Sequence, residues 1–199
     1  MLGFRLALSH TPQPLGDISN KKIIWRKEGD IMKLELTWEN LGNIKEGRPT
    51  FGTDCPVLMY RLLQFSLRNV IETELGEGKG GEYLYKAGEL AGRLIHKKFL
   101  ADIKDPDELF TKLANLLYEL KVCILRMEKS DPDKGEFVLT ASEDLDCSGV
   151  PEIGWPICQF DEGFVAGILS VFTGKRAVVK EVSCWATGER FCRLEAKVE

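Results

Sequence analysis

The sequence has no hydrophobic run long enough to cross a membrane and no block of basic residues. A membrane-spanning helix needs roughly 18 consecutive apolar residues, and the longest apolar stretches here are interrupted by Arg, Asp or Gly. The 199 residues carry 27 basic and 31 acidic side chains, for a net charge of −4, and these charges are interleaved along the chain. We therefore expect no membrane partner and no nucleic-acid partner.

An export signal is also missing. The opening MLGFRLALSH has an Arg inside its short apolar run, and no small-residue cleavage site follows. We therefore expect a cytoplasmic protein, whose 6 cysteines stay reduced. In that compartment clustered thiols bind metals or carry out chemistry more often than they form disulfides.

The sequence has no signature of a nucleotide or redox cofactor. The segment GEGKGG at residues 76–81 lacks the order of a phosphate-binding loop and follows a predicted helix, so we interpret it as a linker. There is no dinucleotide fingerprint, no flavin signature and no spare acid–base pair beside an obvious nucleophile. These absences weigh against an enzyme without excluding one.

What is present predicts an α+β fold with helices packed on an antiparallel sheet. A β-hairpin of Lys22–Lys27 and Ile31–Trp38 forms an N-terminal extension over residues 1–55, and the main domain covers 56–199. Apolar residues at helical spacing predict three helices in the first half of this domain. They are Pro56–Leu75, capped by Asp54, then Glu82–Leu100 and Asp105–Leu120. A hairpin of Val122–Lys129 with Glu136–Glu143, a helix from Asp161 to Gly174 and a last hairpin within Val178–Val198 follow.

The last hairpin carries two cysteines. Cys184 and Cys192 are equally far from Gly188, which places them opposite each other on one face, with Cβ atoms roughly 4.5–5.5 Å apart. Strand alternation predicts that Val182 and Cys184 both point into the core. Glu181 then points to the other face unless a bulge near Val182 or Ser183 turns it inward.

A third cysteine, Cys158, lies just before the predicted helix N-cap Asp161, where the helix dipole lowers the pKa of a thiol. Thiolates with one carboxylate suit tetrahedral zinc, so we predict a zinc site made of Cys158, Glu181, Cys184 and Cys192. If Glu181 does not turn inward, Cys147 completes a cysteine-only site. The remaining alternatives for Cys184 and Cys192 are core packing and redox chemistry.

The run E-x-x-C-x-x-x-G-x-x-x-C at Glu181, Cys184, Gly188 and Cys192, with GEYLYKAGELAG at residues 81–92 and the segment 163–174, resembles the 4-vinyl-reductase-like domain family. The resemblance implies a fold similar to small subunits of the TRAPP vesicle-tethering complex, often dimeric. It also implies an aromatic or other hydrocarbon ligand in an interior pocket, beside a zinc ion held by Cys, Glu, Cys and Cys. Cys158, Glu181, Cys184 and Cys192 match that ligand set in type and order. The ATPase and DNA-binding domains of the related bacterial regulators are missing from this chain.

Three functions follow as hypotheses. The leading one is a sensor or regulatory domain that binds a small hydrophobic or aromatic molecule between the helices of residues 82–120 and the sheet. The second is an enzyme or accessory factor acting on a tetrapyrrole or aromatic compound, and the third is a dimeric scaffold with structural zinc only. A complete set of four protein ligands argues against zinc catalysis, which needs an open coordination position.

Two further predictions concern the pocket and the oligomer. His96, Trp155 and Trp185 are candidate pocket residues, although a histidine without function and packing roles for the tryptophans are the simpler interpretations. The small residues Ala87, Gly88, Ala91 and Gly92 form one helix face that allows either a homodimer or an intrachain neighbour to approach closely.

Overall fold

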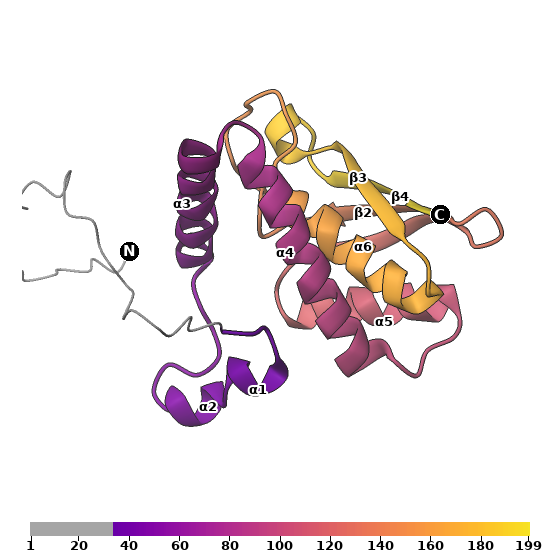
Figure 1. Cartoon of the computed structure of the whole chain (residues 1–199), viewed down its shortest axis with the longest axis horizontal. Helices are drawn as coiled ribbons and strands as arrows, with labels where there is room; N and C mark the ends of the chain where they lie inside the picture. Colours follow the sequence, from indigo (N-terminus) through magenta and orange to yellow (C-terminus); the bar gives the residue numbers. More distant parts are fainter. Residues whose placement is uncertain (1–33) are drawn as a thin grey trace, which may run out of the picture. The chain divides into compact units, whose positions relative to one another are not determined.

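The computed structural model describes residues 34–199. Two short helices, α1 (Trp38–Leu41) and α2 (Ile44–Gly47), precede the longer α3 (Val57–Leu75) (Figure 1). Helix α4 (Lys79–Ile95) continues into a π-helix (His96–Leu100) and is followed by α5 (Pro106–Glu119). The second half contains β1 (Ile124–Asp131), β2 (Glu136–Ser142), α6 (Gln159–Thr173), β3 (Ala177–Ser183), a short 3-10 helix (Trp185–Thr187) and β4 (Cys192–Val198).

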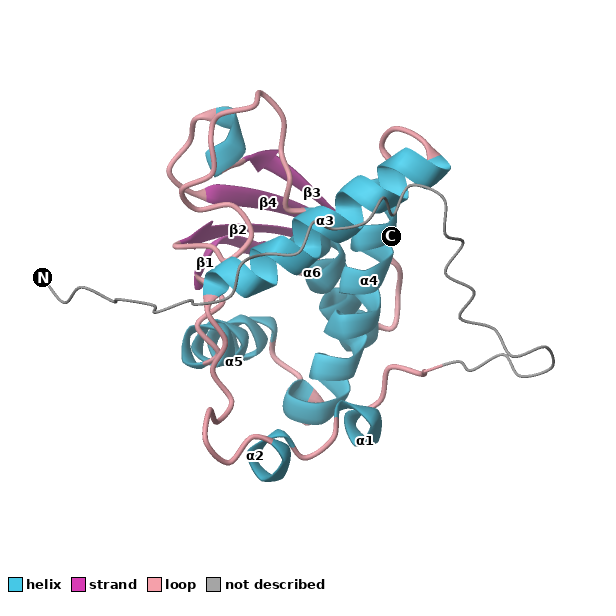
Figure 2. Cartoon of the chain, turned by 90° about the vertical axis from the view of Figure 1, so that its left-hand side faces the viewer, coloured by secondary structure: helices cyan, strands magenta, loops and turns pink. Residues whose placement is uncertain are grey.

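The four strands form one antiparallel sheet in the order β1-β2-β4-β3. Helix α6 packs against β3 and β4, α4 packs on the far side of α6, and α5 packs against β1 (Figure 2). Side chains along β2, β3 and β4 alternate between buried and more exposed positions, because only one face of the sheet carries helices. The predicted α+β fold, with the hairpin β1–β2 and the C-terminal hairpin β3–β4, is therefore confirmed. Among residues 34–199 no helix has the length and apolar character that spanning a membrane requires.

The predicted N-terminal hairpin lies largely outside the described residues. The end of its second strand is described, and there residues 34–37 form no strand while Trp38 begins α1. The reason is local, because the Thr37 side chain accepts a hydrogen bond from the Asn40 amide and so caps a helix.

Several helix ends differ from the prediction. Helix α6 has Cys158 as its N-cap and begins at Gln159, so Asp161 lies in its first turn, whereas Gly174 ends the helix in a left-handed conformation as predicted. Helix α3 is preceded by Pro56 and has no side-chain cap, so Asp54 does not cap it. Helix α4 begins at Lys79, inside the segment 76–81 that we interpreted as a linker.

Helices α4 and α6 cross so closely that their backbones touch at glycines. A Cβ atom added at Gly88 would overlap the carbonyl oxygen of Phe160, and one added at Gly163 would overlap that of Tyr85. Gly92 and Gly167 meet the other helix in the same way. The glycines of the predicted small-residue face thus pack against an intrachain neighbour, and the prediction that a second copy packs on this face is wrong. Their close approach allows α6 to lie deep against the sheet.

We expect Gly88→Ala or Gly163→Ala to lower the free energy of unfolding by about 2 kcal/mol or more, because no rotamer change relieves an overlap with backbone atoms. Chemical denaturation of the two variants measures this loss. Gly47→Ala is the matched control, since a Cβ at Gly47 meets nothing within 4 Å, and its stability should stay close to that of the wild type. Equal stability of all three variants would contradict the observed helix crossing.

Candidate functional site

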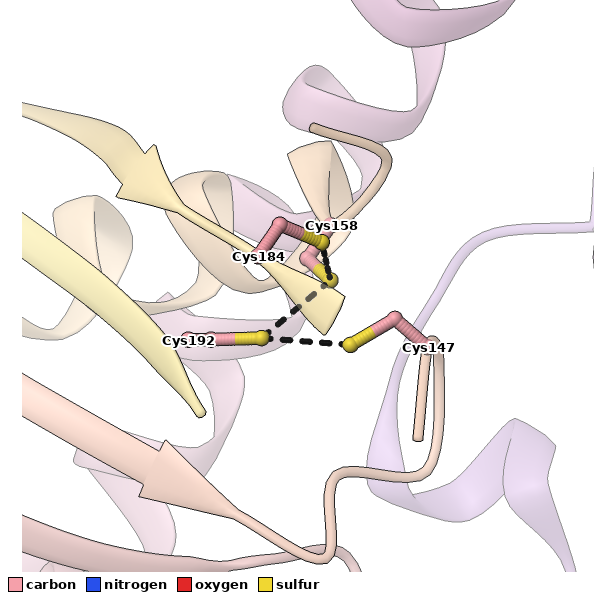
Figure 3. A group of neighbouring side chains, drawn as sticks. All are labelled: Cys147, Cys158, Cys184 and Cys192. Atoms are coloured by element: carbon pink, nitrogen blue, oxygen red, sulfur yellow. Dashed lines mark hydrogen bonds between the residues drawn. The ribbon is translucent and has the colours of Figure 1, made fainter. Parts of the chain in front are cut away.

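Four buried cysteines converge at one end of the sheet. Cys147 comes from the loop after β2, Cys158 from the N-terminus of α6, Cys184 from the residue after β3 and Cys192 from the start of β4. Their sulfur atoms all lie within 4.8 Å of one another. The sulfurs of Cys147 and Cys192 are 3.2 Å apart, and the sulfur of Cys158 lies 3.7 Å from that of Cys184 and 3.8 Å from that of Cys192 (Figure 3).

These distances fit a tetrahedral metal site. A zinc–sulfur bond of about 2.3 Å corresponds, in a regular tetrahedron, to sulfur atoms about 3.8 Å apart. Two of the measured separations, 3.7 and 3.8 Å, are close to that value, and the third, 3.2 Å, needs only a small side-chain movement. All six cysteines of the chain are free thiols. The cluster can therefore hold a thiophilic divalent cation without rearrangement of the backbone.

Glu181 also reaches this region, because the required bulge is present. The pairing with β4 shifts between Glu181 and Ser183, so that Val182 is an extra residue on β3. As a result Glu181 is buried with Cys184, whereas Val182 is 49% exposed and the prediction that it points into the core is wrong. Glu181 Oε2 accepts a hydrogen bond from the Cys158 amide at 3.1 Å, and its buried Oε1 has no hydrogen-bond partner.

The electrostatics of the site also call for a cation. Burial, followed by the negative charge of Cys184, raises the pKa of Glu181 to about 8. Hydrogen bonds from the neighbouring thiols, that of Cys147 foremost, lower the pKa of Cys184, and the same contacts raise the pKa of Cys158 and of Cys192. Without a cation the cluster therefore favours a single thiolate, whereas a bound divalent ion would stabilise all four as thiolates.

A cavity of about 180 Å³ adjoins the cluster, with Cys192 in its wall. It lies between the sheet and helices α4, α5 and α6, which is where we predicted a pocket. Tyr60 and the carboxyl groups of Asp144, Asp146 and Asp161 form its polar side. Most of the remaining wall is apolar and includes Ile95, Leu117, Leu125, Phe160, Phe164 and Leu194.

The acidic loop at residues 144–147 links the cavity to the thiols. Asp144 Oδ1 accepts hydrogen bonds from the amides of Asp146 (2.8 Å) and Cys147 (3.1 Å), which fixes the turn that presents the Cys147 sulfur. Asp146 accepts hydrogen bonds from the Tyr60 hydroxyl and from Gln64 Nε2, both at 2.6 Å. Burial and the neighbouring Asp144 raise the pKa of Asp146 to about 6 and raise that of Asp161. The sequence analysis overlooked this acidic side of the cavity, although the run Asp144-Leu145-Asp146-Cys147 signals it.

The three predicted pocket residues lie apart from this cavity. His96 is buried next to Phe172 and lines a different hollow with Lys97 and Lys104. Burial lowers the pKa of His96, the charge of Lys104 adds to this, and neither ring nitrogen has a hydrogen-bond partner. Trp155 is 62% exposed, and Trp185 is half-buried beneath the Arg190 guanidinium, which lies 4.7 Å from its ring centre.

Residues 137–198 match the vinyl-4-reductase domain family. This segment extends from β2 to the end of β4 and contains all four clustered cysteines together with Glu181. The chain contains a vinyl-4-reductase domain. The resemblance to the 4-vinyl-reductase-like domain, based on the spacing of Glu181, Cys184, Gly188 and Cys192, is thereby confirmed.

Two uncharacterized proteins of Methanocaldococcus jannaschii are similar to this chain in sequence. MJ1642 is 29% identical over 150 residues, which cover 74% of this chain and 80% of that protein. MJ0150 is 25% identical over 186 residues, which cover 93% of this chain and 97% of that protein. The second alignment extends well beyond residues 137–198, so the similarity includes the helical half of the chain.

Solved structures share the fold of this chain. The phenol-responsive sensory domain of the transcription activator PoxR with phenol superposes with a TM-score of 0.57 at 15% identity, over 74% of this chain and 78% of that chain. A vinyl-4-reductase family protein from Methanocaldococcus jannaschii gives 0.57 at 18% identity, over 85% and 99%. A trafficking protein particle complex subunit 3 from Naegleria fowleri, covalently bound to palmitic acid, gives 0.53 at 13% identity, over 72% and 97%. The expected likeness to TRAPP subunits is thus found.

Exchanging single ligand candidates separates the two possible metal-ligand sets. If four thiolates hold the ion, Cys147→Ser should abolish stoichiometric zinc, because one of four bonds is lost. Glu181→Gln keeps an acceptor for the Cys158 amide and should keep one zinc per chain, with an affinity lower by about 10-fold to 100-fold at most, as for a residue beside the ligands. Elemental analysis and competition with a chelator measure both quantities.

Cys55→Ser is the control, since Cys55 is exposed and lies outside the cluster. The opposite result, metal retained by Cys147→Ser and lost by Glu181→Gln, would assign the site to Cys158, Glu181, Cys184 and Cys192.

Proposed function

We propose that this protein binds a small apolar molecule with a single aromatic ring, in the cavity beside a zinc ion held by Cys147, Cys158, Cys184 and Cys192. The observation that carries the proposal is the cavity itself, an apolar space in the middle of the domain whose wall includes Cys192. Protein interiors are close-packed, so an internal space of this size calls for an explanation. A ligand supplies one.

The volume favours a small ligand. An apolar cavity of about 150 Å³ holds one benzene molecule, whereas sites for drug-sized ligands measure about 300–1,000 Å³. The cavity here has about 180 Å³, which is enough for one substituted ring. A tetrapyrrole or a long acyl chain would need a large opening of the helices. The size therefore favours the sensor hypothesis over an enzyme or accessory factor acting on tetrapyrroles.

The polar side of the cavity suits a ligand hydroxyl group. The oxygens of Asp146 are already occupied by Tyr60 and Gln64, and Oδ1 of Asp144 by two backbone amides. Asp161 faces the same cavity from the first turn of α6. A carboxyl group accepts a hydrogen bond when ionised and donates one when protonated, so Asp161 suits a phenolic hydroxyl in either state.

Zinc in this site supplies a structural cross-link, because four thiolates leave no coordination position for water or substrate. The protein residues it would join come from the loop after β2, the N-terminus of α6 and both strands of the last hairpin. Three of these segments also line the cavity, through Asp146, Asp161 and Leu194. The cross-link would hold the cavity wall in place, which keeps the binding site preformed.

The structural relatives support the same function. The sensory domain of PoxR, which has the same fold, is phenol-responsive and was solved with phenol, and the subunit 3 relative carries palmitic acid. Both are proteins of this fold that hold an apolar molecule. At 15% and 13% identity the likeness extends to the fold, and the size of the cavity in this chain chooses between the two kinds of ligand.

A thermal-shift titration tests the proposal. Toluene and phenol should raise the melting temperature increasingly with concentration, because a ligand that binds only the folded state stabilises it by mass action. Protoporphyrin and palmitate should leave it unchanged. Ala141→Phe places a ring into the cavity and should remove the response, whereas Ala87→Phe adds the same side chain at an exposed site on α4 and should keep it.

A response to palmitate or protoporphyrin that Ala141→Phe also removes would assign the cavity to a larger ligand. No response to any of the four compounds would leave the scaffold with structural zinc as the function to accept.

A further inference from the structure

Helix α3 packs on the rest of the domain with its polar face. Its inward side chains bind the two loops that carry Cys147 and Cys158. Arg61 Nε and Nη2 donate to the carbonyl oxygens of Leu145 and Ser148, both at 2.8 Å. Arg68 Nη2 donates to the carbonyl oxygen of Ile157 at 2.8 Å. With Tyr60 and Gln64 on Asp146, these bonds define a polar inner face, the reverse of an ordinary surface helix.

The opposite face of α3 is apolar. Helical spacing places Leu58, Met59, Leu62, Leu63 and Val70 on this outer stripe, and all five side chains are exposed, with Leu62 at 54% and Leu63 at 68%. No element of residues 35–199 covers them. Single exposed apolar side chains are ordinary, but a continuous stripe along a helix marks a surface that another molecule covers.

The polar residues on the stripe need no outside partner. The Ser66 hydroxyl donates to the Leu63 carbonyl oxygen at 3.1 Å, and the Thr73 hydroxyl donates to the Asn69 carbonyl oxygen at 2.8 Å. Burial of these hydroxyl groups would leave no donor unsatisfied. The outer stripe can therefore become the dry centre of an interface along its whole length.

The two ends of α3 complement each other electrically. The N-terminus has no side-chain cap and no acidic residue in its first turn, so its free amides and positive dipole end are uncompensated. The C-terminal turn has no basic residue and carries the exposed Glu74. A second α3 lying antiparallel would bring each Glu74 to the N-terminus of the other helix, so each end stabilises the opposite end.

We propose that the outer stripe of α3 binds the same stripe of a second copy of this chain, antiparallel and about a two-fold axis close to Ser66. This axis places Leu62 opposite Val70 of the partner subunit and Glu74 at the first turn of the partner's α3. The small Ser66 side chains at the axis allow close approach. A membrane surface fits this stripe less well, because it has no Lys or Arg to meet lipid headgroups.

Sedimentation velocity of the full chain tests the interface. The wild type should form a dimer at micromolar concentration, and Leu62→Glu should weaken it by about 30-fold or more, because a charge would be buried at the centre. Tyr118→Glu is the control, since Tyr118 is an equally exposed apolar side chain on α5. Circular dichroism of both variants checks that the fold is retained.

Cross-linking tests the antiparallel arrangement. In a Cys55→Ser background, which removes the only exposed cysteine of the described residues, Ser66→Cys should form a disulfide-linked dimer under mild oxidation. Met59→Cys should not, because an antiparallel pair separates the two copies of this residue. Efficient cross-linking at Met59→Cys would show a parallel pair and overturn the arrangement.

Two outcomes would overturn the interface itself. One is a wild-type chain that stays monomeric at about 100 μM, well above a micromolar dissociation constant. If Leu62→Glu then also lowers the melting temperature, the stripe is covered by the chain's own residues 1–33. The other is a dimer that Leu62→Glu leaves unchanged, which would place the contact elsewhere.

Discussion

The fold depends on bringing four sulfur atoms together within 4.8 Å in the protein interior. The segments that carry them are a loop, a helix N-terminus and two strand ends, none of which is stabilised by apolar packing alone. Four buried thiols next to the carboxyl groups of Glu181 and Asp144 collect negative charge as they ionise, and burial makes such charge costly unless a cation balances it. A divalent ion would convert this costly group into a cross-link between the sheet, α6 and the cavity wall.

How far the sequence predicts this arrangement depends on which interactions are local. The hairpins, most of the helices and the facing positions of Cys184 and Cys192 follow from strand alternation, helical spacing and the distance to Gly188. Strand alternation failed at Val182, because a bulge of one residue reverses every side chain after it, and the sequence signals a bulge only weakly. The position of Cys147 depends on hydrogen bonds from Asp144 and on α3, which are contacts between segments far apart in the chain.

The small residues of α4 show a different limit. Gly88 and Gly92 predict a close approach of some backbone, and periodicity alone does not say which one. The glycines Gly163 and Gly167 have the same spacing of four residues, so the pair of patterns marks two helices of one chain that cross at glycines. Filling this face from within the chain leaves α3 as the helix with an uncovered apolar face. The predicted dimer therefore needs a different surface.

Helix α3 connects the cavity with that surface. Tyr60 lines the cavity and holds Asp146, while Met59 and Leu63, its neighbours on the helix, lie on the outer stripe. A ligand that changes the contact between Tyr60 and Asp146 would act on the helix that carries the proposed dimer contact. Linkage then requires the effect to be mutual: a ligand that favours the dimer binds the dimer more tightly, by the same factor. A ligand that binds both states equally leaves the dimer unchanged, so the cavity regulates assembly only if α3 takes two positions.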